Sequence, residues 1–336
     1  MATPALDTAV SKHNAMRPPS FWRRFGMQFG TWGVGLAIWL VFMFTAPEAF
    51  GSKDIYLAFA STTPIFALMA IPLTLVIITG EIDLSFPSIM ALSVAIFSKV
   101  YDAWGSVWLA VIACLVIGTL CGVLNGKLVT FFAIPSLVIT IGTGFLFQGT
   151  ELAIMNGSGF GLTDDKLDLI TKILVGRTFF SIPNQFWWTI IATIVLWFVL
   201  NRTRFGAHVF LTGDNKFSAQ LMGVNVDRVK TRTFALVGFF AAFAGLVASF
   251  EVSYFWPTLG NGLLLNTIAA VFLGGTSIFG GAGTIVGTFV GAFIIGGIGA
   301  GVVASGISAF YTLVFFGLVI VLSVILQAII SRRVKK

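Results

Sequence analysis

A short polar turn with two carboxylates, Thr79–Ser88 (TGEIDLSFPS), separates two apolar runs. A carboxylate at membrane depth costs roughly 2.5 to 3.5 kcal/mol on insertion scales, so Glu81 and Asp83 each need a partner or a watery cavity. Asp83 or Ser85 can also cap the helix that follows, with Pro87 tolerated in its first turn. The turn therefore predicts either a polar pathway or a helix cap.

A second group of polar residues lies in the apolar run 135–155. Its members are Ser136, Thr140, Thr143, Gln148 and Glu151. Positions 136, 140 and 143 are spaced i, i+4 and i+7, so they share one face of a helix. Such a face can line a polar pathway or form hydrogen bonds between helices. Both interpretations stay open on the sequence alone.

The residue patterns of catalysis and nucleotide hydrolysis do not occur in this sequence. It has no G-x-x-x-x-G-K-[ST] phosphate-binding loop, so the chain itself is not expected to hydrolyse ATP. The 2 histidines, His13 and His208, lie in separate polar stretches, and the 2 cysteines, Cys114 and Cys121, fall in one apolar run as packed thiols. We predict no catalytic residue, no metal site and no cofactor bound by this chain.

The elements that must position the polar residues are membrane helices. Hydrophobic residues make up 57% of the 336 residues and charged residues 10%, whereas soluble proteins carry about 25% charged residues. Spans of about 20 apolar residues fit roughly ten times, and the alternation of a β-barrel is not found. The predicted fold is an all-α polytopic membrane protein. The expected spans are 29–46, 55–79, 87–100, 106–124, 134–154, 187–200, 232–250, 263–279, 284–303 and 308–330.

The positive charges predict the orientation of the chain. Among the 20 lysines and arginines, those expected outside are Lys53, Lys99, Lys166, Lys172 and Arg177. The others lie in the two terminal segments, at Lys127 and in a basic central loop, which predicts that both termini and this loop are cytoplasmic. The net charge of +7 therefore indicates orientation and not nucleic-acid binding. The expected divisions are a cytoplasmic tail 1–28, a transmembrane domain 29–331 and a cytoplasmic tail 332–336, with an outer loop 156–186 and a cytoplasmic loop 201–231.

Two further segments carry recognisable local patterns. In the outer loop, Thr163 followed by two aspartates predicts a helix start. The apolar stripe Leu167, Ile170, Ile173 and Leu174 then indicates a short helix on the outer surface. In the last third, the glycines at 274, 275, 280, 281 and 283 predict a tight turn. Gly283, Gly287 and Gly291 then repeat every four residues, which lets helices approach closely.

Three stretches, taken together, resemble one known family. They are TGEIDLSFPS, RTRFGAHVFLTGDNKFSAQLMGVNVDRVK and PTLGNGLLLNTIAAVFLGGTSIFGGAGTIVGT. These resemble the polar turn, the coupling loop and the glycine-rich series of permease subunits of bacterial ABC importers for simple sugars, the ribose-type family. The resemblance covers most of the chain, from about residue 60 to 325.

The resemblance implies a transport subunit of the bacterial inner membrane and not an enzyme. The chain would import a monosaccharide or a related small polyol with two ATPase chains, which bind ATP and Mg²⁺, an extracytoplasmic solute-binding protein and a second permease chain, identical or different. Loop 201–231 would contain a coupling helix, between spans six and seven, that docks into the ATPase. The residues implied for coupling are Gly213, Asp214, Asn215, Ala219, Gly223 and Val224.

The chain departs from the family pattern where substrate and partner would be recognised. Glu81 stands where the family has a second glycine, Leu264 and Asn266 replace an acidic pair, and residues 216–219 read KFSA in place of Pro-Glu-Ala-Ala. The predicted pathway residues are Asp83, Ser85, Thr140, Thr143, Gln148 and Asn266. An ABC permease for nucleosides or branched-chain amino acids, and an ion-coupled secondary carrier, remain the alternatives.

Overall fold

The chain folds almost entirely into helices, which confirms the predicted helical class. The computed structural model describes the backbone of residues 21–308 and 310–334, so tail residues 1–20 and 335–336 lie outside the described residues. The long helices are α1 (Phe21–Thr45), α3 (Lys53–Ile78), α4 (Phe86–Trp104), α5 (Val107–Phe132), α6 (Ser136–Met155), α8 (Asn184–Arg202), α11 (Val226–Glu251), α13 (Ile285–Ala304) and α14 (Tyr311–Val334). The shorter ones are α2 (Pro47–Phe50), η1 (Asp165–Leu167), α7 (Asp168–Val175), α9 (Arg204–Asp214), α10 (Lys216–Leu221) and α12 (Leu263–Leu273).

Within the described residues, 6 helices are long and apolar enough to cross a membrane. They are α3, α5, α6, α8, α11 and α13. Shorter apolar helical segments occur at Thr31–Thr45, Leu263–Leu273 and Tyr311–Leu322. The chain is therefore a multi-pass membrane protein. The predicted count of ten spans would also require α1, α4, α12 and α14 to cross.

One predicted span was wrong at its C-terminal end. The sequence predicts a span over 263–279, but α12 ends at Leu273. Gly274 and Gly275 follow, and Gly275 has a φ of 86°, in the left-handed region that commonly ends helices. With 11 residues, α12 is about 16 Å long, roughly half of the bilayer core.

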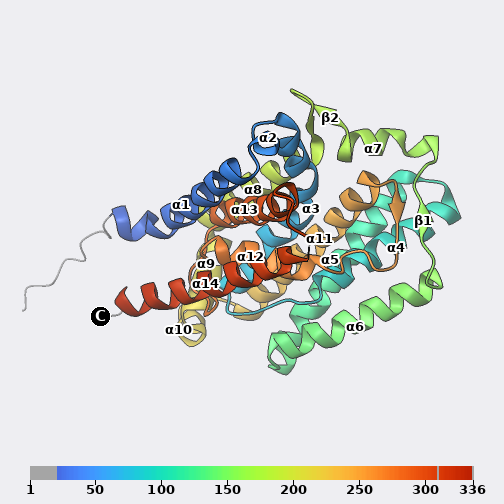
Figure 1. The fold of residues 1–336 in the computed structure, drawn as a ribbon. Coiled ribbons are helices and arrows are strands. Elements are labelled where there is room, and N and C mark those ends of the chain that lie inside the picture. The colour runs from blue at the N-terminus through green and yellow to red at the C-terminus, as the bar shows by residue number, and fades with distance from the viewer. Residues whose placement is uncertain (1–20, 309, 335–336) are drawn as a thin grey trace, which may run out of the picture.

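Helix α3 lies at the centre of the bundle (Figure 1), with α1 and α14 to one side and α5 and α6 to the other. Its apolar segment is 89% buried, although Pro64 and Pro72 both lie inside it. The corresponding segments of α5, α6 and α8 are only 28% buried, and side chains such as Phe131 and Phe145 are 81% and 71% exposed. Apolar side chains exposed on membrane-length helices fit contact with lipid.

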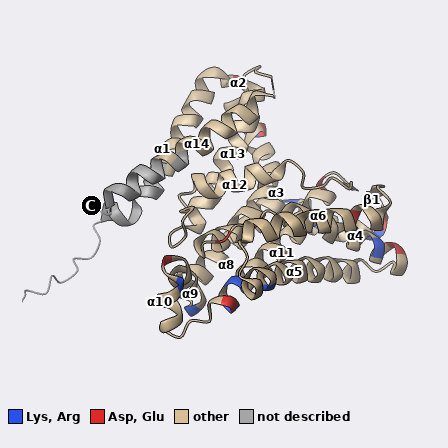
Figure 2. Cartoon of the chain, turned by 90° about the horizontal axis from the view of Figure 1, so that it is seen from below, with Lys and Arg blue, Asp and Glu red and all other residues tan. Residues whose placement is uncertain are grey.

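Charged residues gather at two ends of the molecule. Figure 2 shows them around α9 and α10 at one end and, at the other, around β1 (Phe160–Gly161), with few between. We call residues 156–186, which contain β1 and are predicted to lie outside, the outer segment. This distribution agrees with a bundle that crosses an apolar layer and meets water on both sides.

The tightest helix pair, α5 against α11, is built on glycines that the sequence analysis did not single out. A Cβ atom at Gly122 would lie 2.2 Å from the carbonyl oxygen of Phe234, and one at Gly238 would lie 2.1 Å from that of Gly118. Gly118, Gly122 and Gly126 follow a spacing of four, so they form one ridge along α5. Close backbone approach through small residues is how membrane helices commonly associate.

The outer segment contains α7 and two minimal β-ladders. The strands are β1 (Phe160–Gly161) paired with β4 (Tyr254–Phe255), and β2 (Arg177–Thr178) paired with β3 (Ile182–Pro183). The cap of the first helical turn is Asp164 and not Thr163, because the Asp164 side chain accepts a hydrogen bond from the backbone N–H of Lys166. That bond, with a second from the Tyr101 hydroxyl, lowers the pKa of Asp164. The segment is therefore attached to the outer end of α4.

Candidate transport site

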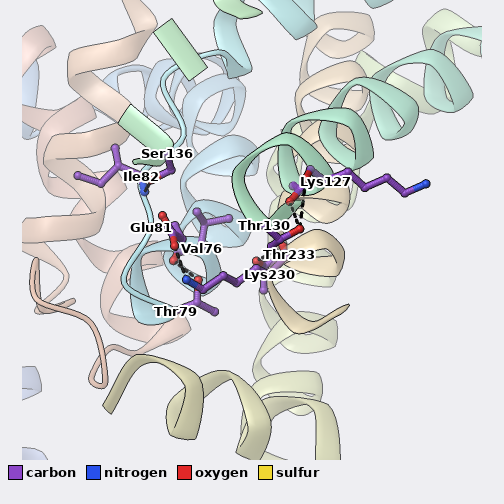
Figure 3. Close-up of polar contacts among 10 residues, drawn as sticks. Val76, Thr79, Glu81, Ile82, Lys127, Thr130, Ser136, Lys230 and Thr233 are labelled. Carbon is purple, nitrogen blue, oxygen red and sulfur yellow. Dashed lines mark hydrogen bonds and ion pairs between the residues drawn. The ribbon is translucent and has the colours of Figure 1, made fainter. Parts of the chain in front are cut away.

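The polar turn after α3 has no regular secondary structure over residues 81–85, and its backbone is hydrogen-bonded to side chains of α6. The backbone N–H of Ile82 donates to Ser136 Oγ at 2.9 Å, and that of Leu84 donates to Thr140 Oγ1 at 3.1 Å. Figure 3 shows Ile82 and Ser136 side by side. The turn has no helix or sheet in which its backbone N–H groups could pair. The two hydroxyls therefore accept hydrogen bonds from backbone donors that would otherwise have no partner. The hydroxyl face predicted on 136–143 thus supports the backbone of the turn.

Asp83 lies at the centre of a buried hydrogen-bond network and has 0% of its surface exposed. Its Oδ1 accepts from the Ser85 backbone N–H at 2.8 Å and from Ser85 Oγ at 2.6 Å. Ser85 Oγ in turn accepts from Asn125 Nδ2, on α5, at 2.6 Å. The second oxygen of Asp83 and the amide oxygen of Asn125 have no hydrogen-bond partner among the described residues. Asp83 therefore fixes Ser85, the residue before α4, although the Ser85 side chain makes no capping bond to the first turn of that helix. One face of the network has unused acceptors.

Substitutions at Asp83 separate these two roles. We expect Asp83→Asn to keep the thermal midpoint in detergent, because an amide oxygen can accept the same two hydrogen bonds, and to lower uptake several-fold. Asp83→Ala leaves buried donors unpaired and should cost about 1 to 3 kcal/mol of stability. Fluorescence-detected size exclusion and uptake, measured on both variants, test this. If Asp83→Asn loses folded protein and uptake in parallel, the residue is only a cap.

Glu81 has the partner that a carboxylate at this depth requires. It forms an ion pair with Lys230 of α11, and the two side chains are 14% and 11% exposed. In Figure 3 the Lys230 ammonium reaches toward Glu81, whereas Lys127 of α5 points away. The pair joins the turn to the first part of α11, immediately after the segment that contains α9 and α10.

Four glycines bring the three family-like stretches together, and we call them the glycine junction: Gly80, Gly213, Gly280 and Gly281. The Gly281 N–H donates to the carbonyl oxygen of Ile78 at 2.9 Å. A Cβ atom at Gly213 would lie 1.7 Å from that same oxygen, and one at Gly280 would lie 3.1 Å from Cα of Gly80. A side chain at Gly213 would overlap the Ile78 carbonyl group, whereas Gly80, Gly280 and Gly281 have φ values of 81°, 80° and 72°, which favour glycine. The end of α9, the turn after α3 and the turn after α12 therefore meet directly.

The loop predicted over 201–231 is mostly helical. It is shorter than predicted, because α8 continues to Arg202 and α11 begins at Val226, and it contains α9 and α10. Asn215 caps α10 by accepting from the Ser218 N–H at 2.9 Å. Gly223, with a φ of 82°, ends the turn that follows α10.

Two residues predicted for coupling point into the protein. Ala219 and Val224 are 0% and 6% exposed and pack in an apolar cluster. Its other buried members come from α3, α8, α9, α11 and α13: Ile71, Leu75, Ile78, Leu196, Leu200, Val209, Val226, Val229 and Ile285. The exposed apolar side chains of this region are Phe217, Leu221 and Met222, at 69%, 74% and 61%. We call these three the apolar face of α10; the sequence signal that could have revealed it is the i, i+4 pair of large apolar residues in a polar loop.

The remaining predicted site residues are more dispersed. Thr143 is buried on α6 and donates to the carbonyl oxygen of its own helix at Ile139, 3.0 Å away. Gln148 and Asn266 are half-buried and are not joined to the Asp83 network by a hydrogen bond within the described residues. Glu151 is buried with neither oxygen paired among the described residues. The pathway role of all these residues stays a prediction.

Two of the three predicted packing glycines, Gly287 and Gly291, lie on α13 and face neighbouring backbones, whereas Gly283 precedes the helix. A Cβ atom at Gly287 would lie 2.0 Å from the carbonyl oxygen of Gly274, and one at Gly291 would lie 2.4 Å from that of Ala270. At Gly283 the near neighbours are the side chains of Ile78 and Thr276. The α13 ridge thus lies against the end of α12.

A hollow of about 420 Å³ lies away from the polar network, between the outer end of α4 and the outer segment. It is lined by Tyr101, Asp102, Gly105, Phe160, Gly161, Thr163, Asp164 and Lys166. None of the predicted pathway residues borders it, so its size alone does not mark it as the path of a solute.

A buried polar turn lies between membrane-length helices, and its backbone contacts the backbone of a basic loop at glycine residues. This fold and site are those of a polytopic membrane transport protein. The sequence model of one family, described as branched-chain amino acid transport system / permease component, matches residues 55–324. The chain belongs to this family of permease components.

Three curated relatives show which import permeases this chain is similar to. Ribose import permease protein RbsC of Escherichia coli K12 is 34% identical over 267 residues, which cover 79% of this chain and 83% of that protein. RbsC of Haemophilus influenzae is 34% identical over 82% of this chain and 85% of its own length. The autoinducer 2 import system permease LsrC of Yersinia pestis (strain Pestoides F) is 35% identical over 77% and 73%. No solved structure matches the chain at a significant level.

These similarities confirm the resemblance that the sequence analysis stated. The relatives are import permeases, so the chain is a transport subunit of an ABC importer and not an enzyme. This finding favours the importer interpretation over an ion-coupled carrier.

Proposed function

We propose that this chain imports a monosaccharide, or a related small polyol, as the membrane subunit of an ATP-driven importer that receives its solute from a binding protein. The similarity to ribose import permease over 79% of the chain carries this proposal. The family description names branched-chain amino acids, and these are the alternative cargo that an uptake assay must include.

The proposed topology has ten spans with both termini in the cytoplasm of the inner membrane. Its divisions are the tail 1–28, the transmembrane domain 29–331 and the tail 332–336, with loop 201–231 inside and loop 156–186 outside. The charges at the two ends of the bundle support it, as does the excess of lysine and arginine in the loop that contains α9 and α10. In this topology α12 covers about half of the bilayer core, and the non-helical residues before it complete the crossing. The C-terminal end of α12 lies near the glycine junction.

The proposed assembly contains two permease chains, two ATPase chains that carry ATP and Mg²⁺, and an extracytoplasmic solute-binding protein. The apolar face of α10 supports docking to the ATPase, since exposed apolar side chains on a short helix suit insertion into a groove. Ala219 and Val224 would hold α10 to the bundle from beneath. Gly213 and Asp214 would pass its movement into the turns that meet at the glycine junction.

The proposed mechanism is a rigid-element switch. Closure of the ATPase pair would move α10 and α9 as a unit. Because the backbone of Gly213 lies against Ile78, and α11 is joined to Glu81 by Lys230, this movement would reach the first residues of the polar turn by two contacts. The turn, with Asp83 and Ser85, would then change its position between α5 and α6.

Affinity purification of the tagged chain from detergent-solubilised membranes tests the assembly. We expect a nucleotide-binding subunit to be recovered with it, together with ATPase activity that the chain lacks alone. Recovery of the chain by itself, under conditions in which a known ABC importer from the same membranes stays intact, would contradict the proposal.

A further inference from the structure

A carboxylate, an amide and a hydroxyl from three helices meet at the end of the bundle opposite α9 and α10. Glu251 is the last residue of α11, Gln185 is the second of α8, and Ser61 lies in the first half of α3. Gln185 Nε2 donates to Glu251 Oε2 at 2.7 Å and to Ser61 Oγ at 3.0 Å. Ser61 Oγ donates to the other carboxylate oxygen of Glu251. The three side chains thus form one closed polar group, which we call the Glu251 cluster.

The cluster has an inner and an outer side. Gln185 is 0% exposed, whereas Glu251 is exposed. Each carboxylate oxygen can accept two hydrogen bonds, and the cluster uses one on each. Glu251 therefore keeps acceptor capacity on its exposed side, and its orientation is fixed by two donors behind it.

Glu251 has no cationic partner among the described residues, in contrast to Glu81. The inner side of the cluster is also incompletely paired. The amide oxygen of Gln185 is buried and has no hydrogen-bond partner among the described residues. Buried polar groups are normally paired, so this unpaired oxygen behind Glu251 points to a polar group that a ligand supplies.

We propose that the Glu251 cluster is a solute-binding position on the outer part of the pathway, which accepts hydrogen bonds from the hydroxyl groups of a neutral sugar or polyol. The inference rests on the proposed function and deepens it. A fixed carboxylate with an amide beside it offers acceptors to hydroxyls. The cluster therefore offers hydrogen-bond acceptors to the hydroxyl groups of a neutral polyhydroxylated solute.

The test uses the complete transporter in cells, with initial uptake of ¹⁴C-labelled ribose, xylose, galactose and leucine. We expect one or more of the sugars, and not leucine, to enter wild-type cells above a deletion background. In Glu251→Gln the maximal rate per folded transporter should fall about tenfold, as for loss of a hydrogen bond to a charged group, with basal ATPase activity unchanged. Ser61→Ala, which keeps the carboxylate but frees its orientation, should give a smaller loss. Glu48→Gln, at an exposed carboxylate of α2, is the matched control and should have no effect.

The outcomes separate the two proposals. If no sugar enters wild-type cells, or leucine does, the proposed cargo is wrong and the cluster assignment falls with it. If a sugar enters and both Glu251→Gln and Ser61→Ala transport it at the wild-type maximal rate, only the cluster assignment is overturned. A loss of uptake that matches the loss of folded transporter in both variants also overturns it, because it indicates a structural role.

Discussion

Leu221→Asp is expected to separate the permease from its ATPase while the membrane domain stays folded. Leu221 is 74% exposed at the end of α10, next to Met222 and one turn after Phe217. A buried aspartate in a docking groove would be unpaired, and loss of a central contact costs 2 kcal/mol or more, so recovery of the ATPase should fall at least about tenfold. Co-purification and ATP-dependent uptake should fall together, with an unchanged size-exclusion profile.

The matched control is Gln220→Asp, which adds the same charge to the same exposed helix beside the apolar face. It should keep at least half of the ATPase recovery. Equal loss in the two variants would show that charge on α10, and not its apolar face, decides docking. Wild-type recovery with Leu221→Asp would show that the ATPase binds elsewhere.

Breaking the Glu81–Lys230 pair is expected to have the largest effect on stability. The two side chains are only 14% and 11% exposed, and removing one partner of a buried pair leaves the other charge uncompensated, at about 3 kcal/mol or more. Glu81→Gln and Lys230→Gln should therefore each lower the thermal midpoint in detergent and reduce uptake strongly.

The exchanged pair, Glu81→Lys with Lys230→Glu, gives the sharpest control. It restores opposite charges across the same contact and should recover much of the lost stability. A double variant no better than the worse single variant would show that local packing, and not the ion pair, explains the losses. If the exchanged pair restores stability but not uptake, the switch requires the carboxylate on the turn and the ammonium on α11, and not only an ion pair between them.

Helix positions were the most predictable part of this fold, because apolar runs of membrane length leave the backbone no other way to pair its polar groups. The start of α12 and the bounds of α13 agree with the prediction to within one residue. The end of α12 was missed because Thr276, Ile278 and Phe279 read as more apolar helix, although the glycines before them end it. Local composition alone does not show whether the glycines end the helix or the apolar residues after them continue it.

The polar turn was found from sequence, but its partners were not. Lys230 lies 149 positions from Glu81, and Asn125 lies 40 positions from Ser85. Nothing in either local pattern specifies such a pairing, since it depends on how α5 and α11 pack. The need for a partner, however, followed from the cost of a carboxylate at membrane depth.

The segment predicted to contain the coupling helix shows the same limit. Family resemblance selected Ala219 and Val224, and the structure places both inward. A helix of six residues has no reliable periodicity, so its exposed face becomes known only when the bundle beneath it is in place. The exposure of Phe217, Leu221 and Met222, in and directly after α10, is consequently a structural result.

The most direct test of the account is ATP-dependent uptake of ¹⁴C-ribose by proteoliposomes that contain the purified permease and its co-purified ATPase, with the solute-binding protein added outside. The account predicts uptake that needs ATP inside the vesicles and is unaffected by a protonophore. Uptake by the permease chain alone, independent of ATP and abolished by the protonophore, would contradict it and identify an ion-coupled carrier.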